Sequence, residues 1–405
     1  MDFNDSAEEA EYRARARAWL AENAPGFEVT PEERRSGGQM EKAKGWQARK
    51  AEGGFACITW PEAWGGGGGT PIQSVIYGQE ESQYAVNSAP FTIGLGMCVP
   101  TVMAFSDDAT KQRFVGPAVK GEEIWCQLFS EPAGGSDVAA ARTRAVRDGE
   151  DWVINGQKVW TSGAQYSDYG IVLVRTNMEA PKHKGLTMFW IDMRSPGIEV
   201  KPIHQMSGGS DFNEVWFTDV RVKDSQRLGA VDEGWKVALV TLMNERLAVG
   251  GASGAGYRDI LELARSLPTD KGSALADSGF RQRLADWYVQ AEGLKLTRFR
   301  TQTALSRGET PGPESSIGKI ISANVMQDLA SAALDLEDQY GILSDPDVAP
   351  LEAAFQQSFM FAPGLRIAGG TDEILKNIIA ERVLGLPGEV RVDKDVAFKD
   401  MPTGR

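Results

Sequence analysis

Residues 152–163 decide the fold, and they read Trp-Val-Ile-Asn-Gly-Gln-Lys-Val-Trp-Thr-Ser-Gly. β-Branched and aromatic residues dominate this stretch at a period close to two, which is typical of strands. Asn155-Gly156 lies between two apolar runs and is the strongest short-range signal for a β-hairpin. Further strand-like runs, with no helical sequence between them, follow at Ile171–Val174, Met188–Ile191 and Val215–Phe217. Consecutive strands of this kind predict an antiparallel sandwich or barrel.

Helical periodicity precedes this β segment. A first helix is expected over residues 7–23, where apolar residues recur at helical spacing at Tyr12, Ala16, Trp19 and Leu20. Similar patterns predict helices over 40–53, 72–85 and 107–120, with loops at 59–70 and 86–91. The run Gly65–Gly69 follows Trp60-Pro61 rather than a strand, so we interpret it as a flexible loop and not as a dinucleotide-binding turn.

The helical period returns after Gly234 and persists almost to the end of the chain. It predicts helices over 235–250, 253–266, 279–306, 316–340, 349–361 and 372–384. Long helices with short connections are typical of a bundle. The expected fold is therefore an α+β multidomain protein, with an N-terminal α-helical domain (1–122), a middle β sandwich or barrel domain (123–230) and a C-terminal four-helix-bundle domain (231–405).

Composition narrows the chemistry. The 405 residues carry a formal charge of −13, which argues against a nucleic-acid-binding surface. Two histidines and three cysteines are too few for most zinc clusters and disulfide scaffolds, so catalysis would depend on carboxylates, hydroxyls, backbone amides or a borrowed cofactor. The N-terminus shows no secretory signal, and no stretch reaches the ~18 apolar residues of a membrane span. A cytoplasmic protein is predicted.

Three segments carry candidate chemistry. Cys126–Asp137 reads Cys-Gln-Leu-Phe-Ser-Glu-Pro-Ala-Gly-Gly-Ser-Asp, and its amides and hydroxyls suit either a polar ligand or a plain turn. In residues 154–163, Trp160 taken alone is better explained as a sandwich-core residue than as a platform for a cofactor. In Ile367–Gly385, Thr371 follows two glycines and begins a helix, which is equally consistent with a phosphate site and a structural cap.

In this order, the three segments resemble those of the acyl-CoA dehydrogenase family, and the resemblance covers essentially the whole chain. Its most specific parts are the blocks Ser-Glu-Pro-x-x-Gly-Ser-Asp and Asn-Gly-x-Lys-x-Trp-x-Ser. Members of that family use FAD to remove one hydrogen from Cα and one from Cβ of an acyl-CoA thioester, leaving a trans-2-enoyl-CoA. Flavin N5 takes the β-hydride, and an electron-transferring flavoprotein is the expected acceptor.

The resemblance also implies cofactor-binding residues. Phe129, Ser130, Trp160 and Ser162 fall on positions that surround the isoalloxazine ring, and Leu128 lies in the same flavin-facing strand. Ser136 falls where the family approaches the FAD pyrophosphate. Thr371 and Glu373 fall on positions that contact the pyrophosphate and ribose.

The catalytic base is where this sequence departs from many family members. They carry a glutamate directly before the Gly-Thr of the last motif, where this chain has Gly369. A minority place it on the first helix of the C-terminal domain. On that helix Glu245 shares a face with Ala238, Leu242 and Val249, where a carboxylate is costly unless it is paired or functional. Periodicity alone leaves a buried ion pair, for instance with Arg246, as an equal alternative, but with Gly369 vacating the usual position Glu245 is the predicted base.

A second departure concerns partners. Homotetrameric relatives complete each FAD site with an Arg-x-x-Phe-Gly segment and a Gly-Gly-x-Gly loop from a neighbouring subunit. Here the corresponding stretches, Ser266–Ser273 and Gln339–Pro346, lack both motifs. Either a paralogous subunit supplies these contacts in an α2β2 assembly of the type that processes steroid side chains, or a homo-oligomer (dimer or tetramer) holds FAD with other residues.

Other functions within the fold remain open: an acyl-CoA oxidase, a flavin monooxygenase or a non-catalytic FAD-binding subunit. The acyl group is not revealed by the sequence. Met243 stands where some relatives have an aspartate that contacts the pantetheine of CoA. Apolar residues that line the acyl cavity or pack a helix core are expected at Phe91, Leu95, Met97, Val99 and Met103, with the glycine loop at 65–70.

Overall fold

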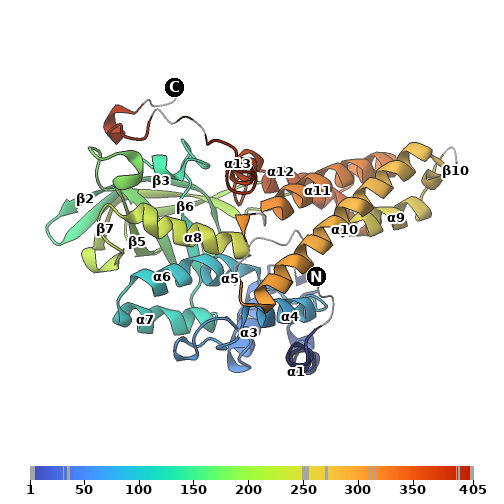
Figure 1. The fold of residues 1–405 in the computed structure, drawn as a ribbon, viewed down its shortest axis with the longest axis horizontal. Coiled ribbons are helices and arrows are strands. Elements are labelled where there is room, and N and C mark those ends of the chain that lie inside the picture. Colours follow the sequence, from blue (N-terminus) through green and yellow to red (C-terminus); the bar gives the residue numbers. More distant parts are fainter. Residues whose placement is uncertain are drawn as a thin grey trace. The chain divides into compact units, whose positions relative to one another are not determined.

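The structure is a computed structural model that describes residues 5–30, 32–33, 37–248, 255–269, 272–309, 312–313, 316–388, 390 and 393–401. Its backbone contacts divide the chain into two compact units (Figure 1). The larger unit contains the described residues of 4–205, 209–248 and 390–405. The bundle unit contains residues 206–208 and the described residues of 249–389. The domain boundaries expected from the sequence remain a prediction.

Helices form the first part of the larger unit. They are α1 (Ala7–Asn23), α3 (Gln39–Glu52), α4 (Pro71–Glu81), α5 (Ala89–Ile93), the π-helical turn η3 (Gly94–Cys98), α6 (Val99–Phe105) and α7 (Asp108–Val119). The helices expected at 7–23, 40–53, 72–85 and 107–120 are therefore present. The loop expected at 86–91 is shorter, because α5 begins at Ala89 with Pro90 in its first turn, where a missing N–H is tolerated.

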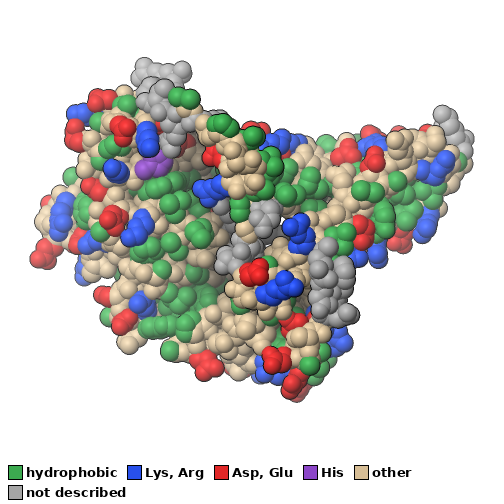
Figure 2. Space-filling view, viewed as in Figure 1, with side chains coloured by type: hydrophobic (Ala, Val, Ile, Leu, Met, Phe, Trp, Pro, Cys, Tyr) green, Lys and Arg blue, Asp and Glu red, His purple; other side chains and the backbone are tan. Residues whose placement is uncertain are grey.

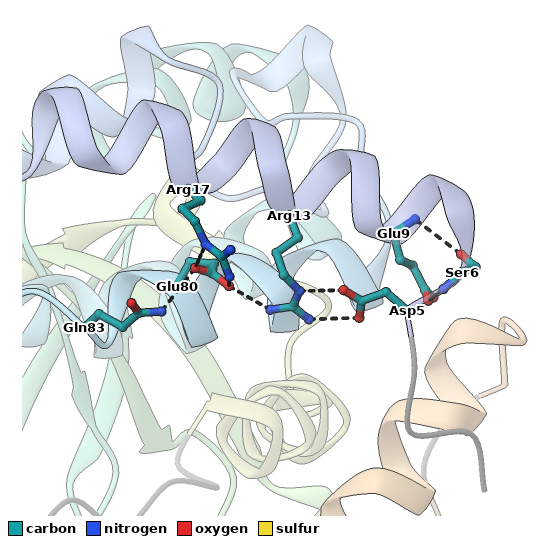
Figure 3. A network of polar contacts seen from close by, with 7 residues as sticks. All are labelled: Asp5, Ser6, Glu9, Arg13, Arg17, Glu80 and Gln83. Atoms are coloured by element: carbon teal, nitrogen blue, oxygen red, sulfur yellow. Dashed lines mark hydrogen bonds and ion pairs between the residues drawn. The ribbon is translucent and has the colours of Figure 1, made fainter.

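A capping box begins α1, and ion pairs join α1 to α4. Ser6 and Glu9 form a reciprocal capping box at the start of α1, and the helix buries Tyr12, Ala16 and Leu20. On the polar side, Figure 3 shows Arg13 and Arg17 converging on Glu80 of α4. Because the Glu80 side chain is only 5 % exposed, these two contacts from one helix to the other compensate a buried carboxylate.

The glycine run forms a loop, as the sequence predicts, and this loop lies close to the preceding backbone. The Gly69 amide donates to the carbonyl of Ile58 (2.7 Å), and the Gly68 amide donates to that of Trp60 (2.9 Å). A Cβ at Gly66 would lie 2.3 Å from the Trp60 carbonyl oxygen. Glycine is needed here because the loop folds back directly onto the preceding backbone.

One eight-stranded sheet forms the middle of the larger unit. Its strands are β1 (Trp125–Leu128), β2 (Arg144–Asp148), β3 (Asp151–Ser162), β4 (Tyr169–Arg175), β5 (Leu186–Asp192), β6 (Ile198–Ile203), β7 (Phe212–Lys223) and β8 (Arg227–Leu228). The order is β6-β7-β3-β2-β4-β5-β8, with β1 beside β4. Most pairs are antiparallel as expected, but β1 pairs with β4 in parallel, and β2 meets β4 through one parallel pair.

The central strands are buried on both faces. On β4, Ile171 and Leu173 belong to a core shared with helical residues such as Val99 and Phe114, whereas Val172 and Val174 face a second core within the β domain. This alternation follows from the two-residue period of a strand. One face of the sheet is therefore covered by helices, as Figure 1 shows for the larger unit.

The predicted hairpin at Asn155-Gly156 is wrong. Residues 151–162 form one continuous strand, and the pairing of β3 with β7 shifts register between Ile154 and Gly156. Gly156 is required by a close approach, because a Cβ there would lie 2.6 Å from the Thr143 hydroxyl oxygen. The Asn155 side chain and Asp219 exchange two hydrogen bonds of 2.9 Å, which stabilise this bulge instead of a turn.

The helix that follows the sheet, α8 (Gly234–Ala248), belongs by its contacts to the larger unit. It packs on η3, α6, β4 and β5. Ala238 and Thr241 are fully buried on its inner side, while Leu239 and Met243 are exposed. Figure 2 shows apolar side chains gathered over this part of the surface and acidic and basic side chains interspersed elsewhere on the visible face.

The bundle unit consists of α9 (Tyr257–Ser266), α10 (Ser278–Ser306), α11 (Ser316–Glu337), α12 (Ala354–Leu365) and α13 (Asp372–Arg382), with a short β9–β10 hairpin (Pro268–Thr269 and Gly272–Ser273). Its core includes Ile260, Trp287, Leu329 and Phe355. These helices match the predicted ones within a few residues. None of the helices in the described parts of the chain is long and apolar enough to span a membrane.

A buried carboxyl group near the end of α11 yields a prediction about stability. Gln356 donates to Glu337 Oε2 (2.6 Å), but Glu337 Oε1 and Gln356 Oε1 have no hydrogen-bond partner among the described residues. Burial raises the pKa of Glu337, which the hydrogen bond from Gln356 only partly offsets. A raised folded-state pKa means that this group favours the folded state below its unfolded pKa and that the advantage is lost as pH rises through the folded value.

We expect Glu337→Gln to remove this loss, because an amide stays neutral and offers a donor to Gln356 Oε1. The free energy of unfolding of the variant should match or exceed that of the wild type, and the difference should grow as pH rises above 4.5. Denaturation at several pH values measures it. A constant difference between the two proteins across pH would contradict the prediction.

Candidate functional site

The two most specific sequence blocks meet in the structure. The carbonyl of Ser130, just after β1, accepts a hydrogen bond from the Val159 amide on β3 (2.9 Å). The Lys158 ammonium donates to the Phe129 carbonyl (3.0 Å) and to Glu131 Oε1 (2.7 Å). The Glu of one block and the Lys of the other are thus an ion pair that holds the two segments together.

This ion pair is fully enclosed. Lys158 is 0 % exposed, and the second oxygen of Glu131 accepts from the Arg142 amide (2.6 Å). Burial works to raise the pKa of Glu131, but Lys158 and the amides of Arg142 and Thr143 hold that pKa below its ordinary value. Burial lowers the pKa of Lys158, and Glu131 partly restores it. Neither side chain has a role predicted from the sequence, although Glu131 and Lys158 stand in the two most specific sequence blocks.

The residue type of Trp160, taken alone, suggested a place in the sandwich core. The structure places Trp160 outside that core. It is 56 % exposed and has a φ of 59°, in the left-handed region that non-glycine residues rarely adopt. It sits where β3 and β7 lose register between Lys158 and Thr161. A large side chain that is both strained and exposed points to a role outside packing, because such strain clusters at functional sites.

Replacing Trp160 with Gly distinguishes a tryptophan that packs the core from one that lies at the surface. Glycine accepts a positive φ without penalty, so we expect the unfolding free energy of the apo-protein to fall by less than about 1 kcal/mol or even to rise. A core tryptophan would instead cost about 3–5 kcal/mol. Urea denaturation of the apo-protein measures the difference, and a loss in the core range would contradict the reading of Trp160 as a surface residue.

The other predicted cofactor residues differ in accessibility. Ser136 is exposed, and Ser130 and Ser162 are half-buried. Leu128, in contrast, is completely buried in the core of the β domain, and Phe129 is buried in the other core, which the sheet shares with the helices. The structure therefore places Leu128 inside the core and not on an accessible face, since alternate residues of β1 point to opposite sides.

Glu245 lies on the half-buried part of α8, as the periodicity predicted for the face it shares with Ala238 and Leu242. Val249 and the side chain of Arg246 fall outside the described residues. Burial raises the pKa of Cys98 well above its usual value, and the nearby Cys126 and Glu245 raise it further. The Glu245 carboxylate is therefore close enough to act electrostatically on a thiol of η3, beside β1.

The apolar residues expected to line a cavity are mostly helix core. Phe91, Met97 and Val99 are buried, while Leu95 and Met103 are partly buried against the same core. Met243 is 62 % exposed on the outer side of α8. The π-helical turn η3 was not foreseen; it lies in contact with α8, and such irregular turns are frequent at functional sites.

The predicted phosphate segment lies in the bundle unit. Gly369 and Gly370 both have positive φ values, and the Thr371 hydroxyl caps α13 by accepting from the Ile374 amide (3.2 Å). Lys319 donates to the Gly370 carbonyl (2.8 Å). Glu373 is exposed on the first turn, and its own amide and Thr371 lower its pKa. The turn is thus rigidly built and presents a helix N-terminus, which favours anions.

A buried carboxylate, Asp372, and its partners stabilise this turn. Asp372 is buried and accepts from Arg366 (2.7 Å) and from Asn324 (3.4 Å). Burial opposes its ionisation, but Arg366 and Lys319 hold the pKa of Asp372 below its ordinary value. Sequence reasoning missed this cluster because Lys319 on α11 reaches Asp372 only through the packing of α11 against α13, and Arg366 turns back to Asp372 from the C-terminal end of α12.

Family models match the chain over three consecutive stretches. The N-terminal, middle and C-terminal domains of acyl-CoA dehydrogenase match residues 6–122, 126–220 and 232–384. The chain is 36% identical to the acyl-CoA dehydrogenase FadE34 of Mycobacterium tuberculosis over 95% of its length, and it spans 50% of that protein. It is 35% identical to the acyl-CoA dehydrogenase IpdE1 of the same organism, over 94% of this chain and 98% of that one.

Solved structures agree. The chain resembles the ChsE4-ChsE5 complex from Mycobacterium tuberculosis with a TM-score of 0.79 and 28% identity, covering 96% of this chain and 100% of that one. It resembles the Tcur3481-Tcur3483 steroid ACAD with a TM-score of 0.80 and 26% identity, at the same coverage. Three matching domains in order, a shared fold and 35% identity over nearly the full length of a relative show that this chain belongs to the acyl-CoA dehydrogenase family of FAD-dependent oxidoreductases.

Proposed function

We propose that this protein binds FAD and dehydrogenates an acyl-CoA thioester to a trans-2-enoyl-CoA. The observation that carries the proposal is the bulge in β3 that presents Trp160, exposed and at a left-handed φ, next to the accessible hydroxyls of Ser130 and Ser162. An aromatic face flanked by hydrogen-bonding groups suits a planar heteroaromatic ring. When bound, FAD supplies an acceptor for a hydride, which no protein side chain provides.

The residues of this chain fit the cofactor. Ser130, Trp160 and Ser162 would contact the ring, and Ser136 would reach the pyrophosphate. Thr371 and Glu373 would contact the pyrophosphate and ribose, where the N-terminus of α13 offers a positive dipole end. Leu128 and Phe129 would contribute support from the core, since both are buried.

Glu245 is the proposed base that takes the α-proton. Gly369, at the position where many family members carry this glutamate, has a φ of 62° and no side chain. Glu245 instead lies half-buried on α8, on the face that also carries Ala238 and Leu242 and within electrostatic reach of Cys98 on η3, and partial burial on such a face suits a carboxylate that must accept a proton. The chain would then belong to the subgroup with Gly-Gly-Thr in the last motif and its base on the first helix after the β domain.

The substrate we favour is a CoA thioester of a steroid side chain or another lipid acyl group. Support comes from the similarity to a structure described as a steroid ACAD. A panel of straight, branched and steroid acyl-CoA thioesters, screened anaerobically for bleaching of the flavin absorbance, tests both the reaction and the acyl group. Absence of bleaching by every thioester, with FAD bound, would overturn the proposed reaction.

Two assemblies fit the missing in-trans motifs: an α2β2 complex with a paralogous subunit, or a homo-oligomer. Where relatives carry the Arg-x-x-Phe-Gly segment, this chain has the short antiparallel strands β9 and β10. The related ChsE4-ChsE5 structure is a complex of two different chains, which supports the first assembly. Expression of this chain alone decides: one FAD per chain and full activity would exclude an obligate partner.

The physiological electron acceptor separates a dehydrogenase from an oxidase. We expect reduced enzyme to pass electrons to an electron-transferring flavoprotein or a dye. Stoichiometric peroxide formation in air, with no need for a dye, would instead identify an acyl-CoA oxidase.

A further inference from the structure

The end of the chain returns to the β domain. Residues 393–401, which we call the C-terminal clasp, run beside the loop 176–185 between β4 and β5 (Figure 1, red segment). Ala397 forms an antiparallel bridge with Pro181, and the Phe398 and Lys399 amides donate to the carbonyls of Ala180 and Met178 (both 3.0 Å). The clasp is therefore anchored by backbone hydrogen bonds and not only by side chains.

Phe398 is the apolar anchor of the clasp. It is 3 % exposed, and the guanidinium carbon of Arg175 lies 3.8 Å from its ring centroid. Arg175 is itself buried and donates to the carbonyls of Ala139 (2.6 Å) and Ala141 (3.3 Å). These two residues lie two and four positions after Asp137, the last residue of the Cys126–Asp137 block. Because a guanidinium gains from an aromatic face only when the ring stays in place, Phe398 stabilises the orientation in which Arg175 holds this segment.

A second connection runs through Lys182. Its side chain is 8 % exposed and pairs with Asp393 of the clasp (2.7 Å) and with Asp137 at the end of the Cys126–Asp137 block (2.8 Å). One buried ammonium thus links the clasp to the residue next to Ser136. Without Asp393, a single half-exposed carboxylate would be left to compensate the buried charge.

We propose that the C-terminal clasp positions the turn that carries Ser136 and Asp137, and thereby sets the affinity for FAD. The inference rests on the proposed function for its ligand, but its structural part does not. Phe398 acts through Arg175 on Ala139 and Ala141, and Asp393 acts through Lys182 on Asp137. Both routes end directly after Ser136, at Asp137 and along the short helix η4 (Val138–Ala140) with the adjoining Ala141, so the clasp residues are positioning residues and not ligands.

Two variants of the full-length chain test the clasp. Phe398→Ala removes the ring under Arg175, and Asp393→Asn removes one carboxylate from Lys182 with little risk to folding. We expect hydrogen–deuterium exchange of amides in residues 131–142 to rise and FAD affinity in titrations of the apo-protein to fall, by about tenfold for Phe398→Ala and less for Asp393→Asn. The matched control is Lys399→Ala, which removes only a surface ion pair of the clasp with Glu179 and should change neither quantity.

The two measurements keep the outcomes distinct. If exchange in 131–142 stays at the wild-type rate in both variants while the clasp itself loses protection, the proposal is overturned. If the wild-type chain binds no FAD, the proposed function fails on that count, yet the exchange data still decide whether the clasp orders the turn. Faster exchange with an unchanged FAD dissociation constant would refute the link to the cofactor.

Discussion

Glu245→Gln is expected to slow the reduction of bound flavin by an acyl-CoA substrate by about 10²–10⁴-fold, the range in which a positioned general base contributes. The amide keeps the size and most of the contacts of the carboxylate but cannot accept the α-proton. FAD content and substrate binding should change little, because the proposed ring contacts lie on β3 and after β1. Anaerobic rapid mixing, monitored through the flavin absorbance, measures the rate directly.

Two further variants serve as controls for Glu245→Gln. Glu245→Asp keeps a base on a shorter stem and should retain part of the rate. Glu262→Gln makes the same chemical change at an exposed position on α9 and should reduce the flavin at the wild-type rate. A normal rate in Glu245→Gln would show that another group takes the proton, and the assignment of the base would then be wrong.

The largest loss of stability is expected for Lys158→Met. The change leaves the Glu131 carboxylate buried with only the amides of Arg142 and Thr143, and breaking a buried pair in this way costs about 3–5 kcal/mol. Chemical denaturation of the apo-protein measures this loss. Lys201→Met is the matched control, because Lys201 pairs with Glu199 at the surface of the same sheet (3.2 Å) and should cost less than about 1 kcal/mol.

The same pair makes a prediction about pH. Since the folded-state pKa of Glu131 is depressed, its contribution to the free energy of unfolding is present above the unfolded value near 4.5 and is lost as pH falls through the folded pKa.

In the double variant Lys158→Met/Glu131→Gln no unpaired charge remains, so it should be more stable than Lys158→Met alone. Equal stability of the single and double variants would argue that the charge of Glu131 is not what makes the single change costly.

Much of the fold was predictable because its signals are local. The period of 3.6 in α1 and α11, the period of two in β3 and β7 and the continuous apolar runs of β4 and β5 come directly from which residues are apolar. Asn155-Gly156 shows where this reasoning fails. The dipeptide permits a turn, but pairing with Asp219 on β7 and the contact with Thr143 favour a bulge in a continuous strand. The parallel pairing of β1 with β4 was not predicted for the same reason, since no short-range sequence signal indicates it.

The candidate site divides in the same way. Ser130, Ser136, Ser162 and Glu245 were predicted from motifs that resemble those of the family, and the structure leaves them accessible or half-buried. Leu128, which was ranked below them, lies in the core, because the alternation of β1 turns it inward. The supporting residues Lys158, Arg175 and Lys182 gain their roles only from partners 27, 36 and 45 positions away in the chain.

The order of residues alone predicted the family of the protein and its α–β–α order, because periodicity and short motifs are properties of neighbours in the chain. The proposal of Glu245 as the base rests on the family resemblance as well as on periodicity. Tertiary structure decided the rest. Burial makes Glu131 and Lys158 an ion pair that joins two segments, and a register shift exposes Trp160 in a strained conformation. Residues 393–401 pack against the β domain. Each of these depends on which distant segments meet and on how much water they exclude, and no local pattern in the chain specifies that.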